Sequence, residues 1–422
     1  MAGRDPLTLA PARAGSSRGI GGPPPGVMAL RTLSADGWSW PSWIQPGEDV
    51  PLVAAPDGSS PRGQVVAELV DGQRRHPAVS VDGEQVTLHF DPRAALELIQ
   101  AEGYVTMRRP LHTYGQIFRL VGALPGPVRL LGHRVSSVLE GLRHRQEPEV
   151  AFPDFPRDRA VELIRLLARR AGGLADRPAL WPDGARSVVL LTHDVDTAEG
   201  QALIPKVARV ERELGLRSCW YVVGDRYPLD HGLLRELRQE GHEIGLHGAR
   251  HDCRLAYLPE DAMARRLDRC RGMMERHHVA GFRSPALLMS DRLGRQLRGR
   301  FLYDSSVPDT DVDTICAPRR GCSAVFPFYR DGLLELPLTL PLDDRLLLHG
   351  QTPDQMNETW LAKLDWIDQV GGVTVVTTHI EPHLGASDAL LGGYRRLLEQ
   401  IKARGDHVKP MLPVEVARLW AG

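Results

Sequence analysis

The strongest constraint on the fold of this chain is an alternation of short apolar runs and amphipathic stretches from about residue 181 onward. Between the runs lie stretches with helical spacing of apolar residues, clearest at 202–215, 232–241, 259–278 and 358–372. Such alternation predicts a mostly parallel α/β sheet or barrel. The expected strands are SVVLLT (187–192), RSCWYVV (217–223), HEIGL (242–246), VAGFR (279–283), FLYDS (301–305), GLLELPL (332–338), VTVVTT (373–378) and HVKPM (407–411).

The preceding part of the chain has a different, mixed pattern. Strands are expected at 64–70 and 84–90, and helices at 92–103 and 157–173. We therefore predict a disordered segment at 1–27, which is rich in Gly, Pro, Ser and Arg, an N-terminal α+β domain of unknown role at 28–180, and a catalytic domain at 181–422. The clustered side chains Trp38, Trp40 and Trp43 fit either packing or a sugar-stacking surface.

Composition excludes few functions, but it bears on the partners and the cellular compartment. A net charge of −1 gives no reason to expect a nucleic-acid partner. No apolar run approaches the ~18 residues of a membrane span, and the N-terminus has no continuous apolar core typical of a secretory signal. Five cysteines without a CxxC pair favour free thiols over a Cys316–Cys322 bridge. These features predict a cytoplasmic protein, and they leave its oligomeric state open.

Side chains with metal-binding chemistry follow two of the predicted strands. Asp194 and Asp196 close the run SVVLLTHDVD, and positions i and i+2 of an extended chain face the same side. His247 and His251 follow HEIGL with a spacing that places both on one face of a helical turn. Ligands gather at the carboxyl ends of parallel strands. One carboxylate and two imidazoles therefore predict a three-ligand divalent-metal site with open positions for water.

Two further residues at strand ends would complete a hydrolytic site. Arg283 follows VAGFR, where a buried guanidinium would keep Asp194 ionised and oriented. His379 ends the apolar run VTVVTT and is expected to act as a general acid. His383 repeats the four-residue spacing with His379, but the intervening Pro382 breaks the helical register that a second chelating pair would need.

In these residues, the chain from about 185 to 415 resembles the polysaccharide deacetylase family, also called the NodB-homology family or carbohydrate esterase family 4. The resemblance implies a distorted (β/α) barrel that removes acetyl groups from sugars with a Zn²⁺-type metal. Four family motifs, T-F-D-D, H-[ST]-x-x-H, R-x-P-aromatic and L-x-L-x-H, resemble in order Thr192–Val195, His247–His251, Arg283–Ala286 and Val375–His379.

The resemblance also distributes the roles. Val195 stands where the family usually has its metal-binding Asp, so the resemblance, as in members with a D-x-D motif, gives the base role to Asp194 and the metal role to Asp196. Gly248 replaces the Ser or Thr of the second motif. The expected substrate-binding positions are Pro285, Ala286 and Thr377, where Ala286 replaces an aromatic residue and Thr377 a leucine. The nearest candidate for the family's fourth motif is Asp304-Ser305-Ser306.

These observations predict a metal-dependent hydrolase of non-peptide C–N bonds. It would remove acetyl from an N-acetylated sugar or a related amide in a biosynthetic intermediate. Asp194, His379 and Arg283 are the expected catalytic residues, and Asp196, His247 and His251 the ligands of a divalent metal, most simply Zn²⁺. The alternatives are a metal-free, allantoinase-like amide hydrolase on the same fold, and a non-catalytic carbohydrate-binding protein.

Overall fold

A computed structural model describes residues 28–52, 54–102, 155–172, 180–309, 321–348 and 350–421 of the chain. The described residues form two compact units. The first contains residues 28–102, 155–172, 180 and 321–324, apart from residue 53, and the second contains the others, from Trp181 onward. The segment 1–27, for which we predict disorder, lies outside the described residues, as does Cys316.

The first unit is a five-stranded antiparallel sheet with two helices. Its strands are β1 (Met28–Thr32), β2 (Asp49–Leu52), β3 (Gln64–Asp71), β4 (Arg74–Asp82) and β5 (Gln85–Leu88), in the order β2-β1-β3-β4-β5. A two-residue turn joins β3 to β4, and its Gly72 has a φ of +57°, as tight hairpins require. Helix α1 (Pro92–Gln100) begins at the N-cap Asp91, and α4 (Phe155–Arg170) packs on β2 and α1.

Two tryptophans of the predicted cluster contact α4 within this unit. Arg170 stacks over the Trp38 ring at 4.6 Å, and Arg159 donates a hydrogen bond to the Trp43 carbonyl oxygen at 2.6 Å. Trp40 packs edge-on against Trp38, with ring centroids 5.4 Å apart. These contacts favour the packing interpretation of the cluster.

The second unit is built on a nine-stranded, mostly parallel sheet. Its order is β11-β12-β10-β9-β8-β7-β6-β13, with β14 also paired to β6. All pairs are parallel except β11–β12. The strands are β6 (Ser187–Val195), β7 (Ser218–Val222), β8 (Glu243–Leu246), β9 (Gly281–Phe282), β10 (Tyr303–Asp304), β11 (Phe328–Arg330), β12 (Leu333–Glu335), β13 (Val373–His379) and β14 (Val408–Met411).

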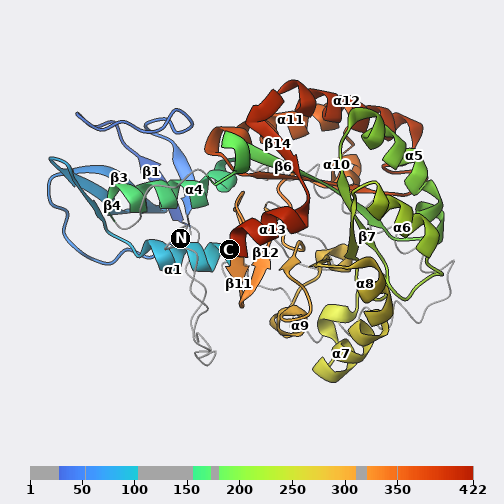
Figure 1. Ribbon diagram of the computed structural model, residues 1–422. Helices are drawn as coiled ribbons and strands as arrows, with labels where there is room; N and C mark the ends of the chain where they lie inside the picture. The colour runs from blue at the N-terminus through green and yellow to red at the C-terminus, as the bar shows by residue number, and fades with distance from the viewer. Residues whose placement is uncertain are drawn as a thin grey trace. The chain divides into compact units, whose positions relative to one another are not determined.

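Helices alternate with these strands and surround the sheet (Figure 1). Five of them begin after an N-cap residue whose side chain accepts a backbone hydrogen bond. For example, α5 begins after the N-cap Thr197 and ends at Gly215 with a φ of +70°. The helices are α5 (Ala198–Leu214), α6 (His231–Gln239), α7 (Glu260–Arg269), α8 (Arg271–His277), α9 (Asp291–Leu297), α10 (Asp343–Leu348), α11 (Pro353–Val370), α12 (Asp388–Ala403) and α13 (Pro413–Ala421).

The fold class is the predicted one, an α/β fold with a distorted, curled barrel sheet. Each of the eight runs expected to be strands overlaps a strand of the second unit. The single helix expected at 259–278 is two helices, because the chain bends at Cys270, which ends α7 and begins α8. Strands β1, β2, β4 and β11 and helices α9, α10, α12 and α13 were not predicted from the sequence.

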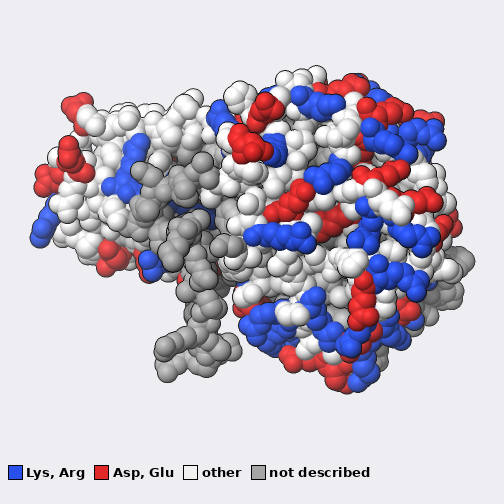
Figure 2. All heavy atoms as spheres, viewed as in Figure 1, with Lys and Arg blue, Asp and Glu red and all other residues white. Residues whose placement is uncertain are grey.

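Surface charge agrees with the near-zero net charge. Figure 2 shows Lys and Arg interspersed with Asp and Glu over most of the visible face. Among the described helices, none is both long enough and apolar enough to cross a membrane. The cytoplasmic location and the exact domain boundaries stay predictions.

Candidate metal and catalytic site

Strand β6 carries the first half of the site. All nine of its residues are buried, as expected for the centre of a parallel sheet. Side chains alternate between the two faces of a strand, so His193 lies on the face opposite to that of Thr192 and Asp194. Its ring nitrogens lie 2.8 Å from Glu211 Oε1 and 2.8 Å from the Thr378 hydroxyl. The side chain of Asp194 lies on the face opposite to that of His193, and Asp196 is the first residue after the strand. Both carboxylates lie at the carboxyl end of the sheet.

The two imidazoles come from the loop after β8. Their spacing predicted a helical turn, and this prediction is wrong, because residues 247–254 form an irregular loop. Gly248 has a φ of +64°, and a Cβ atom there would lie 2.8 Å from Pro285 Cδ. Only glycine fits this position without backbone strain. The Ser or Thr of the family motif would have a Cβ atom at positive φ and too close to Pro285. The loop still brings the rings of His247 and His251 to 5.3 Å between centroids.

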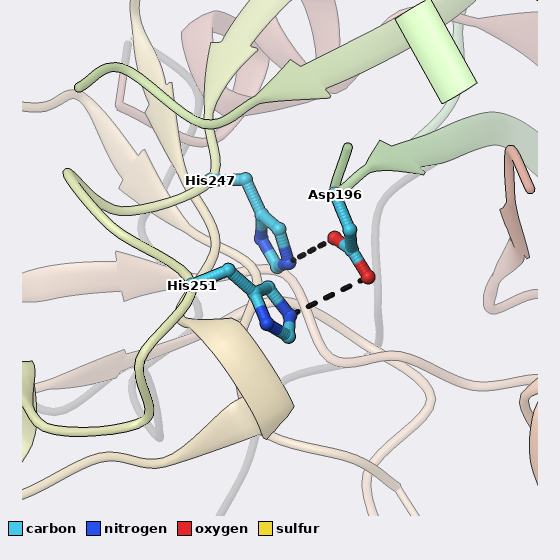
Figure 3. A group of neighbouring side chains, drawn as sticks. All are labelled: Asp196, His247 and His251. Carbon is cyan, nitrogen blue, oxygen red and sulfur yellow. Dashed lines mark ion pairs between the residues drawn. The ribbon is translucent and has the colours of Figure 1, made fainter. Parts of the chain in front are cut away.

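Asp196 faces both imidazoles (Figure 3). Its Oδ1 lies 3.2 Å from His247 Nε2, and its Oδ2 lies 3.4 Å from His251 Nε2. Two ligand atoms held at ~2.1 Å by a tetrahedral ion are about 3.4 Å apart. Oδ1 is buried and accepts no well-formed hydrogen bond from the described residues. The donor set and its spacing therefore fit a divalent metal ion.

The orientation of His247 and the lowered pKa of His251 suit metal binding. His247 Nδ1 donates to the Arg283 carbonyl oxygen at 3.1 Å, which leaves Nε2 facing Asp196. Burial opposes a positive charge on His247, but the nearby Asp194 and Asp196 outweigh it and raise its pKa. Burial dominates at His251 and lowers its pKa to about 4, so that this ring is neutral at pH 7.

Arg283, directly after β9, is fully buried beside Asp194. Its Nη1 donates to Asp194 Oδ1 at 2.9 Å and to the Thr192 hydroxyl at 3.0 Å. Its other nitrogens donate to the carbonyl and hydroxyl oxygens of Ser305, at 2.9 and 3.0 Å. The guanidinium also lies 4.1 Å from the centre of the Tyr221 ring. Burial would raise the pKa of Asp194, but Arg283 and His247 outweigh it and lower that pKa.

His379, the last residue of β13, lies opposite Asp194 in the parallel pairing of β13 with β6. Its Nδ1 lies 2.6 Å from Asp343 Oδ1, and its backbone N–H donates to Asp343 Oδ2 at 2.9 Å. Burial disfavours the imidazolium, but Asp343 and Asp344 outweigh it and hold the His379 pKa well above its ordinary value. His379 also forms a possible ligand group with these two aspartates.

Sequence reasoning missed Asp343. The signal was available, since the acidic pair Asp343-Asp344 follows shortly after a predicted strand. The fourth-motif candidate, Asp304-Ser305-Ser306, instead lies at the end of β10, where Ser305 holds Arg283. His383 is exposed, outside the metal-ligand groups found among the described residues.

The three expected substrate-binding residues differ in their exposure. Pro285 is buried and Ala286 is exposed, and both belong to a short 3-10 turn after Arg283. Ala286 and Leu287 have φ values of +51° and +55°, which are strained for residues with side chains. Thr377 is buried, and its hydroxyl lies 2.9 Å from that of Thr192.

Comparison with known proteins finds one family match and several similar structures for the second unit. Residues 182–299 match the family model for polysaccharide deacetylase. An assigned polysaccharide deacetylase from Mycobacterium smegmatis is 24% identical, with a TM-score of 0.48, over 58% of this chain and 93% of that one. The Puue allantoinase is 16% identical, with a TM-score of 0.47, over 59% of this chain and 94% of that one. No curated protein sequence matches the chain.

A third structure, assigned as a polysaccharide deacetylase from Pseudomonas aeruginosa PAO1, is 15% identical with a TM-score of 0.47. The match covers 59% of this chain and 95% of that one. The segment that matches the polysaccharide deacetylase family model contains Asp194, Asp196, His247, His251 and Arg283, and His379 lies outside it.

Proposed function

We propose that the protein is a metal-dependent hydrolase that removes an acetyl group from an N-acetylated saccharide. One observation carries the proposal. At one end of β6, a possible metal-ligand triad of Asp196, His247 and His251 adjoins a carboxylate that a buried arginine keeps ionised. The match of residues 182–299 to the polysaccharide deacetylase family model supports the reaction class.

The triad would hold the metal, with His247 and His251 each offering Nε2 and Asp196 its carboxylate. When bound, a Zn²⁺-type ion polarises an acetyl carbonyl and makes a water molecule more acidic. Zn²⁺ suits a site of two imidazoles and one carboxylate.

The residues of the chain would then move the protons. Asp194, ionised beside Arg283, accepts the proton of the attacking water. His379, charged through Asp343, protonates the departing amine through its Nε2. The N–H of Ser284 donates to the Ser306 hydroxyl and Pro285 has no N–H, so the backbone N–H of Ala286 is the next along the chain that could stabilise the oxyanion.

The test is metal content measured together with activity. Purified protein is expected to hold one equivalent of metal per chain and to release acetate from an N-acetylated hexosamine. His247→Ala should lose both metal and activity, because two remaining ligands bind weakly. His383→Ala, at an exposed histidine outside the triad, is the matched control and should retain both. Stoichiometric metal in His247→Ala would refute the ligand assignment.

A further inference from the structure

A hollow beside the candidate catalytic site is lined by the loop after β7, by Arg250 from the loop after β8, by His231 at the start of α6 and by helices α7 and α8. Its volume is about 620 Å³. Sites for small molecules usually measure ~300–1,000 Å³, so a sugar or a sugar derivative fits this space. Tyr227, Leu229 and Met273 supply less polar parts of its wall.

The elements around the hollow are held together by specific contacts. The N–H of Gly224 donates to the Gly248 carbonyl at 3.0 Å, and the N–H of Asp225 donates to the Ala249 carbonyl at 2.7 Å. A Cβ atom on Gly224 would lie 2.5 Å from Cys270 Sγ, at the corner between α7 and α8. These contacts place basic side chains from two loops and two helices around one space.

The hollow is strongly basic, although the whole chain has a net charge of −1. Its single carboxylate, Asp225, lies 3.3 Å from Arg250 Nε and 3.5 Å from Arg269 Nε. One carboxylate cannot neutralise the four guanidinium groups that line the hollow. These belong to Arg226, Arg250, Arg269 and Arg276.

The hollow is connected directly to the proposed metal ligands. Arg226 Nη1 donates to the backbone oxygen of Asp196 at 3.2 Å. Tyr227, in the same loop, donates its hydroxyl to the Val195 carbonyl at 2.7 Å. Arg250 is the residue before His251. Residues that line the hollow therefore contact or adjoin two of the proposed metal ligands, Asp196 and His251.

We propose that the hollow binds a phosphate or pyrophosphate group on the substrate, so that the enzyme acts on an acetylated sugar that carries phosphate. The proposal rests on the function proposed above and adds the substrate class. Guanidinium groups bind phosphate oxygens in pairs, and several arginines match a group with more than one negative charge. A single sugar carboxylate would leave most of these cations without a partner.

The first experiment measures binding and needs no catalysis. Inorganic pyrophosphate is titrated into the protein by calorimetry at low salt. Arg269→Gln and Arg276→Gln should each raise the Kd roughly 10-fold or more, because each removes a charge-assisted contact. Arg265→Gln is the matched control on α7, since Arg265 is exposed, pairs with Asp261 at 2.7 Å and does not line the hollow. Equal pyrophosphate affinity in all three variants would overturn the proposal.

The second experiment measures selectivity. The wild-type protein should deacetylate an N-acetylhexosamine 1-phosphate with a kcat/KM about 10-fold or more above that for the unphosphorylated sugar, and Arg269→Gln should reduce this ratio. Preference for the neutral sugar would refute the substrate class. Arginine-dependent pyrophosphate binding without deacetylation of either sugar would support the anion site and count against the proposed deacetylase function.

Discussion

Two aspartates separated by one residue have different partners, and this difference sets their proposed roles. Asp194 is 2% exposed and bound to Arg283, whereas Asp196 faces two imidazoles. A carboxylate locked to a guanidinium keeps its charge but has one oxygen occupied. The carboxylate that faces two imidazole nitrogens suits a metal ion better. Sequence position alone gives no such distinction.

Substitution of each aspartate by asparagine should separate the two roles. Asp194→Asn is expected to keep the metal and to lose about 10²–10⁴ in kcat, the usual size of a lost general base. Asp196→Asn should instead lower metal occupancy, because an amide oxygen carries no charge to bind the ion. Metal analysis and steady-state kinetics on both proteins check this. The reverse pattern would mean that the two roles are exchanged.

The His379–Asp343 pair predicts a shift of the alkaline limb of the pH–activity profile. A general acid works while it is protonated, so activity should fall as pH rises through the raised pKa of His379. Asp343→Asn can keep a hydrogen bond to Nδ1 but removes the charge that raises this pKa. The alkaline limb should therefore move to lower pH, toward the ordinary histidine value of about 6.5.

The control for that shift is Asp354→Asn, which changes an exposed aspartate paired with Arg396. Its profile should coincide with that of the wild type. An unchanged alkaline limb in Asp343→Asn would exclude His379 as the group that titrates there.

At the scale of elements, the site depends on how closely helix α5 approaches the loop after β13. Gly200 lies in the first turn of α5, and a Cβ atom there would be 2.1 Å from the Ile380 carbonyl oxygen. The next residue, Glu381, accepts a hydrogen bond from Thr197, the N-cap of α5, at 2.9 Å. The helix start and the segment that follows His379 are thus fitted to each other.

Gly200→Ala should therefore destabilise the protein even though alanine favours helices. The backbone must shift to remove the clash, and a cost of about 1–3 kcal/mol in the free energy of unfolding is expected. Gly392→Ala, inside α12, is the matched control, because its nearest neighbour is the end of the Arg396 side chain at 3.7 Å. It should stabilise the protein by about 0.5–1 kcal/mol. Urea unfolding of both variants measures the difference, and equal effects would contradict the close approach.

At the scale of the whole molecule, a buried acid links stability to pH. Glu243, at the start of β8, accepts hydrogen bonds from Tyr303 at 2.8 Å and from the Val414 N–H at 2.9 Å. Burial raises its pKa to about 7, against an ordinary value of about 4.5. The folded protein therefore keeps a proton in a pH range where the unfolded chain has released it.

The raised pKa of Glu243 makes the free energy of unfolding fall as pH rises. As pH rises from about 4.5 to about 7, unfolding releases the Glu243 proton, so its contribution to the free energy of unfolding should fall by up to about 3 kcal/mol. Glu243→Gln removes the titrating group. Denaturant unfolding between pH 5 and pH 8 should show a smaller loss of stability with rising pH in the variant than in the wild type. Parallel profiles would exclude this acid as the source.

The sequence by itself determined the α/β class, the eight core strands and the residues at their ends, because apolar periodicity and strand-end polarity are local properties. It also predicted α1 and α4 of the first unit, where helical spacing is clear. Its prediction of a helical turn for the two histidines was wrong, because the chain passes through Gly248 at positive φ. There it lies close to Pro285, 37 residues away in the chain.

Only the tertiary structure decided which polar groups share an environment. Asp343 and His379 are 36 residues apart and meet through the placement of α10 beside β13. The basic hollow likewise assembles arginines from two loops and two helices, none of which forms a motif in the sequence. Such contacts are fixed by long-range packing, and a pattern of neighbouring residues carries no record of them.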